Sequence, residues 1–333
     1  MKRNILINIL TPFPHQTFLR QLDPKMKEEG FLFYENETLS VLWDMVIVYE
    51  GIAEHTKIKC RKGGLVFISG EPPWSRKYSA KYLKQFDYII TSHTKIKHPG
   101  KNLIQQALPW HFGFNYREKK FNYDFDDIEK MPAPQKTKKI SFITSNKCMM
   151  PGHKQRMLFL EVLKSKFDNE IDVFGYGINP IDDKAKALLP YQFCICLENS
   201  SIYNYWTEKI ADPILAYCIP IYYGCKNIDQ YFNRNVLIKI DPKYIGRSID
   251  TIEHILVNAN MIYNEKLEQL KIERIKLIKE YSLFAVLIEF YRNNIQDQIG
   301  EDIVINLRPA ELFWDNHALM SILRMKRYIY RYL

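Results

Sequence analysis

The chain has 333 residues, of which 47% are hydrophobic and 26% charged, a composition typical of a soluble globular protein with one large or two ordinary domains. The net charge of +9 suits nucleic acid, an anionic membrane or a phosphate-bearing ligand, and six cysteines without disulfide-type spacing favour buried, reduced thiols. The sequence has no run of about 18 apolar residues, so we expect no membrane-spanning helix. The N-terminus is typical of a first β-strand rather than a signal peptide.

Short apolar segments alternate with a helical pattern over the first 110 residues. The helical spacing lies at 75–86, and the expected strands cover 4–10, 44–52, 64–71, 88–92 and 102–110. The charged segment that follows contains two prolines and has no clear periodicity. We interpret residues 115–138 as a linker between two domains.

The same alternation restarts after this linker. Helices are expected at 153–167, 207–218 and over roughly 250–293, and strands at 139–146, 171–177, 191–199, 219–224 and 236–241. Strands and helices in regular alternation predict parallel sheets. We therefore expect an α/β fold with two Rossmann-like domains, residues 1–114 and 139–293, facing a central cleft.

Residues 294–333 form a C-terminal helical tail in this division. Over 316–333 an apolar face repeats at steps of mostly three to four residues, and the basic residues of this segment are Arg324, Lys326, Arg327 and Arg331. A basic amphipathic helix at an anionic membrane surface would have this pattern. A terminal helix packed on the first domain would explain it equally well.

The stretch FCICLENSSIYNYWTEKIADPILAYCIPIYYG, residues 193–224, gathers polar side chains between apolar segments. A strand that ends in Glu198 and Asn199 places them at the carboxyl edge of a sheet, where open α/β folds bind ligands. Thr207 can cap the next helix, whose free N–H groups, together with Lys209, suit a phosphate or diphosphate. The glutamate between these two residues would suit sugar hydroxyls, and a capped helix with solvated charges is the alternative.

This stretch resembles the donor-binding signature of the α-1,3/1,4-fucosyltransferases, the family 10 glycosyltransferases. The signature consists of an aromatic residue, ENS, a tyrosine-containing gap, TEK, an apolar helix and a Pro-containing strand that ends in Gly. The resemblance implies a GT-B fold, with the acceptor on the side of the first domain and the nucleotide-sugar donor in the second. It assigns donor binding to Asn199, Tyr205, Glu208 and Lys209.

Two further segments carry the same resemblance. ITSNKCMMPGHKQRMLFLEVL (143–163) resembles the family's SN…R segment, which implies that Arg156, with Lys154 close by, binds the donor phosphates. ISGEPPW (68–74) resembles the GE segment, which implies that Glu71 is the catalytic base. The family more often has GEN at this point, where two prolines follow here. FGYG resembles the family's VYG turn, to which we assign no chemistry.

A metal site is the main alternative to a diphosphate clamp of fixed cations. Asp124 and Asp126 match the Asp-x-Asp of many glycosyltransferases, but they lie in the charged linker and not after a strand. Arg156 and Lys209 would neutralise a leaving diphosphate by themselves, so we expect neither metal nor another cofactor. No two of the histidines His93, His98 and His111 have the helical i, i+4 spacing of a metal-binding pair, so they do not indicate a metal site.

The resemblance implies an inverting transfer of L-fucose from GDP-fucose to a hydroxyl of an N-acetylglucosamine-type residue, with an α-1,3 linkage favoured over α-1,4. We expect a role in bacterial surface polysaccharide or lipopolysaccharide synthesis in the cytoplasm. One version of this role has the enzyme at the inner face of the plasma membrane, where it acts on a lipid-linked acceptor. Another GDP-sugar is one alternative. The other is a non-catalytic module in which the basic, aromatic stretch 57–101 binds nucleic acid or membrane. The acidic residues of 193–224 argue against a nucleic-acid partner.

Overall fold

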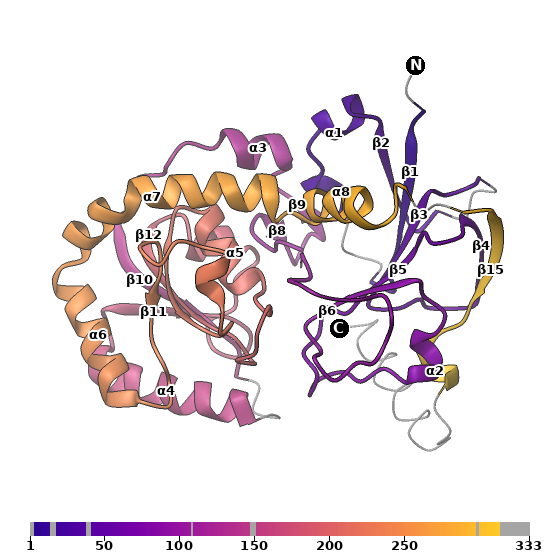
Figure 1. The fold of residues 1–333 in the computed structure, drawn as a ribbon. Helices are drawn as coiled ribbons and strands as arrows, with labels where there is room; N and C mark the ends of the chain where they lie inside the picture. The colour runs from indigo at the N-terminus through magenta and orange to yellow at the C-terminus, as the bar shows by residue number, and fades with distance from the viewer. Residues whose placement is uncertain are drawn as a thin grey trace. The chain divides into compact units, whose positions relative to one another are not determined.

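The computed structural model describes residues 3–13, 18–37, 41–107, 109–146, 151–297 and 300–313 (Figure 1). The chain folds into two compact units, which we call the first and the second domain. The first comprises Met1–Gln106 and Leu283–Leu333, and the second comprises Ala107–Ser282. The basic segment 316–333 lies outside the described residues, so both interpretations of it stay predictions.

The first domain is built on a six-stranded parallel sheet. In spatial order its strands are β2 (Phe31–Glu35), β1 (Ile5–Leu10), β3 (Met45–Tyr49), β5 (Leu65–Ile68), β6 (Tyr88–Thr91) and β7 (Lys101–Leu103). The central strands β3 and β5 are continuous apolar runs that are buried throughout, as in parallel sheets covered on both faces. The strand order reverses between β1 and β3, which makes this point the topological switch of the sheet.

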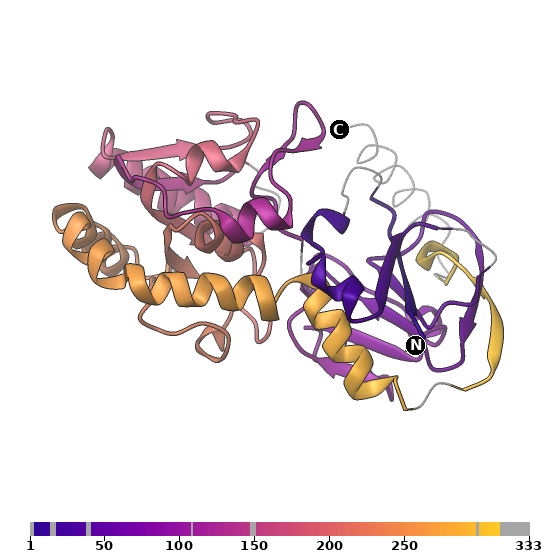
Figure 2. The ribbon, with the colours of Figure 1, turned by 90° about the horizontal axis from the view of Figure 1, so that it is seen from above.

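Segments from distant parts of the chain pack on this first-domain sheet or join its core. The ring of Phe284 packs on Phe33 with ring centroids 4.8 Å apart, which fixes α8 (Leu283–Asn294) on the first domain (Figure 2). Ile58 and Leu307 belong to a core cluster of the same domain. They come from an antiparallel pair formed by β4 (Thr56–Arg61) and β15 (Asp302–Leu307). The short helices of this domain are α1 (Lys25–Glu28) and α2 (Ala80–Leu83), with 3-10 turns at Leu19–Gln21 and Ala310–Phe313.

The second domain has a five-stranded parallel sheet. Its strands, in spatial order, are β11 (Ile171–Phe174), β10 (Lys138–Ile143), β12 (Tyr191–Leu197), β13 (Ile219–Tyr223) and β14 (Ile238–Lys239). The order reverses between β10 and β12, so the switch point lies at the carboxyl ends of these two strands. The two parallel sheets confirm the α/β class and the two Rossmann-like domains. The cleft between the domains stays a prediction.

Helices cover both faces of the second sheet. Figure 1 shows α7 on one side of it and α4 on the other. Phe159 and Leu163 of α4, and Leu270 and Leu277 of α7, are buried in one core together with the strands. The helices of this domain that follow β10 are α4 (Pro151–Phe167), α5 (Glu208–Leu215), α6 (Ile245–Val257) and α7 (Ala259–Glu280), with 3-10 turns at Lys184–Ala187 and Ile228–Gln230.

The segment interpreted as a linker is part of the second domain. It folds into a hairpin of β8 (Phe114–Asn115) with β9 (Lys120–Phe121), followed by α3 (Phe125–Lys130). Phe125 and Ile128 are buried in the domain core. Asp124 is the N-cap of α3, where its side chain accepts the N–H of Asp127 at 2.9 Å and the side chain of Asp127 accepts that of Asp124 at 3.0 Å. Of the Asp-x-Asp pair, Asp124 therefore forms a capping box with Asp127, and Asp126 pairs with Lys130 at 2.6 Å.

The domain limits and several elements also differ from the expected ones. Part of the tail that was expected to be helical, Asp302–Leu307, is the strand β15, because it pairs with β4. Trp110 and Phe112 pack in the second-domain core, which moves that boundary ahead of residue 114. Helix α8 belongs to the first domain because its aromatic rings pack on β2. The helix expected over 75–86 is reduced to α2, which begins after the N-cap Ser79, and the strand expected at 102–110 is reduced to β7.

Candidate active site

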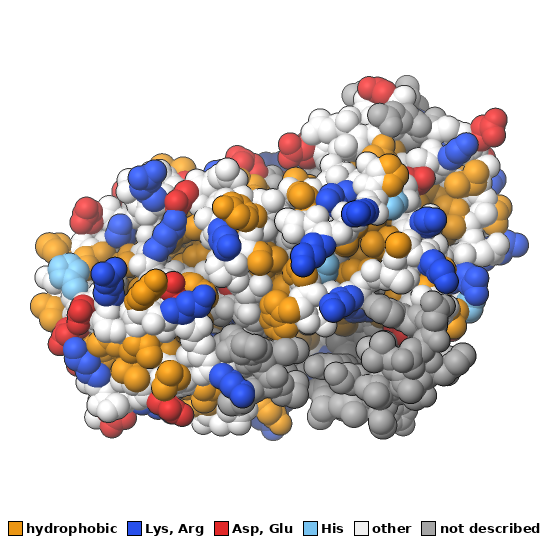
Figure 3. Space-filling model, turned by 60° about the horizontal axis from the view of Figure 1, so that its bottom comes forward, with side chains coloured by type: hydrophobic (Ala, Val, Ile, Leu, Met, Phe, Trp, Pro, Cys, Tyr) orange, Lys and Arg blue, Asp and Glu red, His pale blue; other side chains and the backbone are white. Residues whose placement is uncertain are grey.

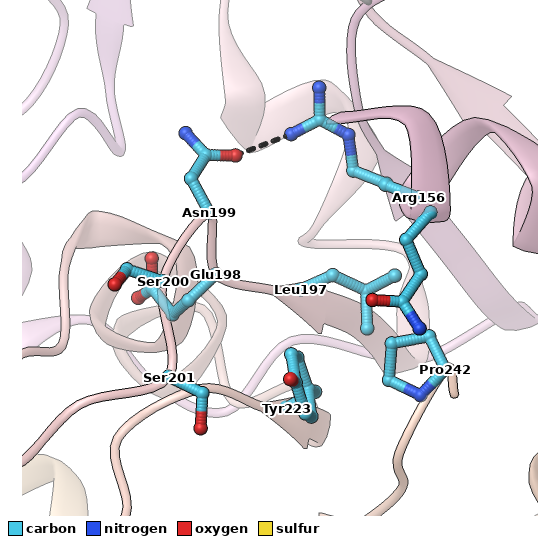
Figure 4. Close-up of a pocket in the computed structure, with 9 residues that line it drawn as sticks. Arg156, Leu197, Glu198, Asn199, Ser200, Ser201, Tyr223 and Pro242 are labelled. Carbon is cyan, nitrogen blue, oxygen red and sulfur yellow. Dashed lines mark hydrogen bonds between the residues drawn. The ribbon is translucent and has the colours of Figure 1, made fainter. Parts of the chain in front are cut away.

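The switch point of the second sheet brings three predicted segments together. Arg156 of α4 donates through Nη1 to the side-chain oxygen of Asn199, which follows β12, at 2.7 Å (Figure 4). Its Nη2 also donates to the carbonyl oxygen of Ser145, after β10, at 3.4 Å. Arg156 is 7% exposed, so a cation is held inside the sheet edge at which α/β folds bind ligands.

The apolar pattern of α4 explains why Arg156 points to this edge. Phe159 and Leu163, three and seven residues later, are buried against the sheet. Residues at these offsets lie on one helix face, so Arg156 shares the buried face with them. Lys154 is exposed. Of the two cations that the sequence offered, Arg156 is therefore the one built into the sheet edge.

A small pocket opens beside Arg156. It has about 330 Å³ of unfilled space, part of it open to solvent, and is lined by Gln155, Arg156, Leu197, Glu198, Asn199, Ser200, Ser201, Tyr223 and Pro242 (Figure 4). Amide, hydroxyl, carboxylate and guanidinium groups thus converge on it from α4 and the end of β12. Such a mixture suits a ligand that carries both anionic and hydroxyl groups.

The first turn of α5 is tied to the end of β12. Thr207 is its N-cap, as expected, and accepts the N–H of Lys209 at 3.2 Å. The buried carboxylate of Glu198 accepts the Thr207 N–H at 2.8 Å and its hydroxyl at 2.9 Å. The ammonium of Lys209 lies 3.5 Å from Glu198 and 3.3 Å from Glu208. The ENS and TEK segments are therefore one connected polar unit.

The charges of this unit support one another. Burial would raise the pKa of Glu208, but the ammonium groups of Lys209 and Lys184 outweigh it and hold that pKa well below its usual range. Burial would lower the pKa of Lys209, but Glu208 and Glu198 raise it. Burial raises the pKa of Glu198 itself. Lys209 and Glu208 are consequently both charged at neutral pH.

Sequence reasoning missed a second layer of charge under α5. Lys184 donates to Asp212 at 2.8 Å and lies 3.6 Å from Glu208. The other oxygen of Asp212 accepts the backbone N–H groups of His111 and Phe112 at 2.9 and 3.0 Å. The segment around Lys184 has no motif or periodicity that marks it, so only the folded chain reveals this layer.

Two glycines in the segments that resemble the family, Gly175 and Gly224, lie where a larger side chain would clash with neighbouring atoms. A Cβ at Gly224, after β13, would lie 2.4 Å from Cγ of Glu198. Gly175, in the turn after β11, has a φ of +131°, and a Cβ there would lie 1.7 Å from the carbonyl oxygen of Thr144. The glycines thus let the backbone approach the carboxyl edge of β10 and β12.

Glu71 lies in the first domain, in the loop after β5. It is exposed, its N–H donates to Oε1 of Glu50 at 2.7 Å, and its carbonyl accepts the Nε2–H of His93 at 2.7 Å. Sequence reasoning missed Glu50, although Glu50 directly follows the strand at 45–49 just as Glu71 follows the next strand of the sheet. The strand-end position was the signal that could have found it.

The remaining candidate residues from the sequence are Tyr205, two of the histidines and the cysteines. Tyr205 is 5% exposed. His98 accepts the N–H of Gly100 at 3.1 Å, and His111 contacts the hydroxyl of Tyr116 at 2.9 Å. All cysteines in the described ranges, which omit Cys148, are buried free thiols.

Three broader features bear on metal, membrane and nucleic-acid binding. Among the described residues, no group of three or more His, Cys, Asp or Glu is placed to hold a metal ion. No helix within the described ranges is both long and apolar enough to span a membrane. On the face drawn in Figure 3, basic side chains are spread among apolar and uncharged ones. The expectation of a metal-free site stays a prediction.

The second domain is similar to a known family over most of its length. Residues 133–256 match the family described as glycosyltransferase family 10 (fucosyltransferase), C-terminal part. The matched segment contains all five residues to which donor binding was assigned, whereas Glu71 lies outside it.

Relatives extend the similarity beyond this domain. An alpha-(1,3)-fucosyltransferase of Helicobacter pylori is 30% identical over 213 residues, which cover 58% of this chain and 42% of that protein. A protein of Acanthamoeba polyphaga mimivirus that is named a fucosyltransferase is 25% identical over 259 residues, covering 73% of this chain and 36% of its own length. The chain therefore spans less than half the length of these two relatives.

A solved structure shows the same fold. The crystal structure of an alpha1,3-fucosyltransferase superposes with a TM-score of 0.51 at 19% identity, over 80% of this chain and 81% of that one. Together with the two parallel sheets, this likeness confirms the GT-B type of the α/β fold.

Proposed function

We propose that the protein is an inverting α-1,3-fucosyltransferase that moves L-fucose from GDP-fucose to a hydroxyl of an N-acetylglucosamine-type residue in a glycan. The observation that carries this proposal is the buried Arg156, hydrogen-bonded to Asn199 at the switch point of the second sheet, within the segment that matches family 10. The similarity to an alpha-(1,3)-fucosyltransferase of Helicobacter pylori supports fucose as the transferred sugar and the α-1,3 linkage.

The donor diphosphate would bind to Arg156 and Lys209. A guanidinium is suited to two phosphate oxygens at once, and the ammonium adds a second fixed charge at the first turn of α5. Asn199, Tyr205 and Glu208 would bind hydroxyls of the ribose or of the fucose. Because both cations are held by neighbouring carbonyl, amide or carboxylate groups before the donor arrives, they need little reorganisation when charge develops on the leaving GDP.

Glu71 would act as the general base. Its carboxylate takes the proton of the acceptor hydroxyl while that oxygen forms a bond with the anomeric carbon of fucose. The bond from this carbon to the phosphate oxygen breaks on the opposite face, and GDP leaves with the electron pair. Attack opposite to the leaving group converts the β-linked donor into an α-linked product. Base assistance of this kind contributes about 10²–10⁴-fold to the rate.

The proposed acceptor and location do not depend on the residues of the donor site. We place the reaction in bacterial surface polysaccharide or lipopolysaccharide synthesis, in the cytoplasm, on an acceptor linked to lipid at the inner face of the plasma membrane. The basic residues of 316–333 support this location, because Arg and Lys side chains near an anionic bilayer surface each contribute about 1 kcal/mol to binding.

A pair of glutamate variants tests the function. With GDP-fucose and an N-acetyllactosamine acceptor, Glu71→Gln should lower kcat by about 10²–10⁴-fold and leave the affinity for GDP unchanged. Glu54→Gln is the matched control, since Glu54 is an exposed glutamate of the same domain. No fucose transfer by the wild-type protein would contradict the function, whereas normal turnover of Glu71→Gln would contradict the assignment of the base.

A further inference from the structure

Glu50 is a buried carboxylate at the switch point of the first sheet. It directly follows β3, is 3% exposed and has a φ of +64°, which non-glycine residues seldom adopt. Backbone strain of this kind persists where the surrounding contacts over-determine the conformation, and it is concentrated at functional sites. The contacts of Glu50 therefore indicate what the strained position achieves.

The two carboxylate oxygens of Glu50 have different partners. Oε1 accepts two successive backbone N–H groups, those of Gly70 and Glu71, the second at 2.7 Å. Oε2 accepts Nη1 of Arg76 at 2.8 Å and the hydroxyl of Tyr78 at 3.0 Å. Four donors satisfy a buried carboxylate, so Glu50 joins the loop after β5 to the segment that follows it.

The two groups that donate to Oε2, Arg76 and Tyr78, keep their protons near neutral pH. Burial would lower the pKa of Arg76, but Tyr78 and Glu50 raise it, so the guanidinium stays a cation beside Glu50. Burial raises the pKa of Tyr78 well above its usual range, so the phenol stays protonated and donates. The hydrogen bonds that Oε2 accepts are therefore fixed across the physiological range.

His93 holds Glu71 from the other side. Its Nε2–H donates to the carbonyl oxygen of Glu71 at 2.7 Å, and its ring lies 5.8 Å from the ring of Tyr78. Burial lowers the pKa of His93, so the ring is neutral at pH 7. The N–H of Glu71 is thus fixed by Glu50 and its carbonyl by His93, which leaves the exposed side chain on a backbone fixed at both ends.

We propose that Glu50 is a positioning residue that aims the catalytic base Glu71 by holding its backbone N–H. This inference rests on the proposed function, since it assigns to Glu50 an effect that passes through Glu71. A displacement of about 1 Å at a reacting group can cost about 10²-fold in rate. The carboxylate must keep both oxygens as acceptors, because an amide nitrogen at either position would face N–H or O–H donors.

A double-mutant cycle tests this route. Glu50→Gln should lower kcat by about 10- to 100-fold and leave the affinity for GDP unchanged, because GDP binds in the other domain. In a Glu71→Gln background the same substitution should cost less than about 2-fold in kcat, since the group it aims is already disabled. Glu54→Gln should be silent in both backgrounds. Equal losses of kcat in both backgrounds, or normal turnover of Glu50→Gln, would overturn the inference.

Glu50→Asp provides a second test if Glu50→Gln does not fold. It keeps the negative charge beside Arg76 and withdraws both oxygens by one methylene, so the protein should stay folded while kcat falls. Hydrogen exchange at the amides of Gly70 and Glu71 should become faster in this variant, and this readout needs no substrate. Unchanged exchange in Glu50→Asp would overturn the inference. Faster exchange in Glu50→Asp, together with no fucose transfer by the wild-type protein, would contradict the proposed function alone.

Discussion

Arg156 of α4 and Asn199 after β12 are joined by a 2.7 Å hydrogen bond across a sequence separation of 43 residues. The bond connects two segments that the sequence linked only through their resemblance to one family. It also orients the guanidinium toward the pocket at the switch point of the sheet. The proposed donor site is thus ordered by contacts within the protein itself.

Arg156→Ala should weaken GDP binding. Hydrogen bonds that involve a charged group contribute about 1.5–3 kcal/mol, so the Kd for GDP should rise by about 10- to 100-fold in calorimetry. Lys154→Ala is the matched control, because Lys154 is an exposed cation of the same helix. An equal loss of affinity in both variants would show that net charge, and not the placement of Arg156, binds the phosphates.

Lys184→Met should destabilise the second domain and weaken GDP binding. Removing one partner of a buried ion pair costs about 3–5 kcal/mol, and Asp212, with a side chain 1% exposed, would remain buried without its cation. Lys186→Met, in the same 3-10 turn, removes an exposed pair with Asp182 and should cost less than about 1 kcal/mol. Denaturant unfolding measures both variants, and equal midpoints would rule out a special role for Lys184.

Gly224→Ala should disturb the carboxylate that connects β12 to α5. The new Cβ would lie 2.4 Å from Cγ of Glu198, so the side chain of Glu198 must move. This movement would weaken the hydrogen bond that Glu198 accepts from the Thr207 N–H. We expect a lower unfolding midpoint and weaker GDP binding. Gly246→Ala is the control, since nothing lies within 4 Å of that position and alanine in helix α6 should stabilise by up to about 1 kcal/mol. A silent Gly224→Ala would remove the steric argument.

The stability of the first domain should depend on the protonation of His93. Burial lowers its pKa below the usual 6.5, so the unfolded chain binds this proton first as the pH falls. Its contribution to stability is present above pH 6.5 and is lost as the pH falls through and below that value. His93→Gln should therefore lose less thermal stability than the wild type between about pH 7.5 and pH 5.5. The same loss in both proteins would contradict this account.

Local patterns predicted much of the second domain. The strand at 191–199, the cap at Thr207 and the strand at 219–224 follow from apolar runs and helix-start chemistry, and the structure has them within two residues. Arg156 could be preferred over Lys154 because the offsets to the apolar residues of α4 fix its face. These features depend on neighbours in the sequence.

Features that depend on distant partners could not be predicted in this way. The pairing of β4 with β15 joins Thr56–Arg61 to Asp302–Leu307, and no local pattern encodes that contact. The hairpin and helix in the expected linker are stabilised by burial of Phe125 and Ile128 in a core formed elsewhere in the chain. Lys184 likewise acquires its role from tertiary partners.

Calorimetric titration with GDP-fucose in the presence of EDTA tests the central claim most directly, with GDP-mannose and UDP-galactose as comparisons. Because the measurement concerns the donor alone, it does not depend on the acceptor. The account predicts binding of GDP-fucose in the micromolar range, tighter than either comparison sugar nucleotide and abolished or strongly weakened in Arg156→Ala. Equal binding of GDP-mannose would contradict fucose as the donor sugar, and no binding of either GDP-sugar by the wild-type protein would contradict the donor site itself.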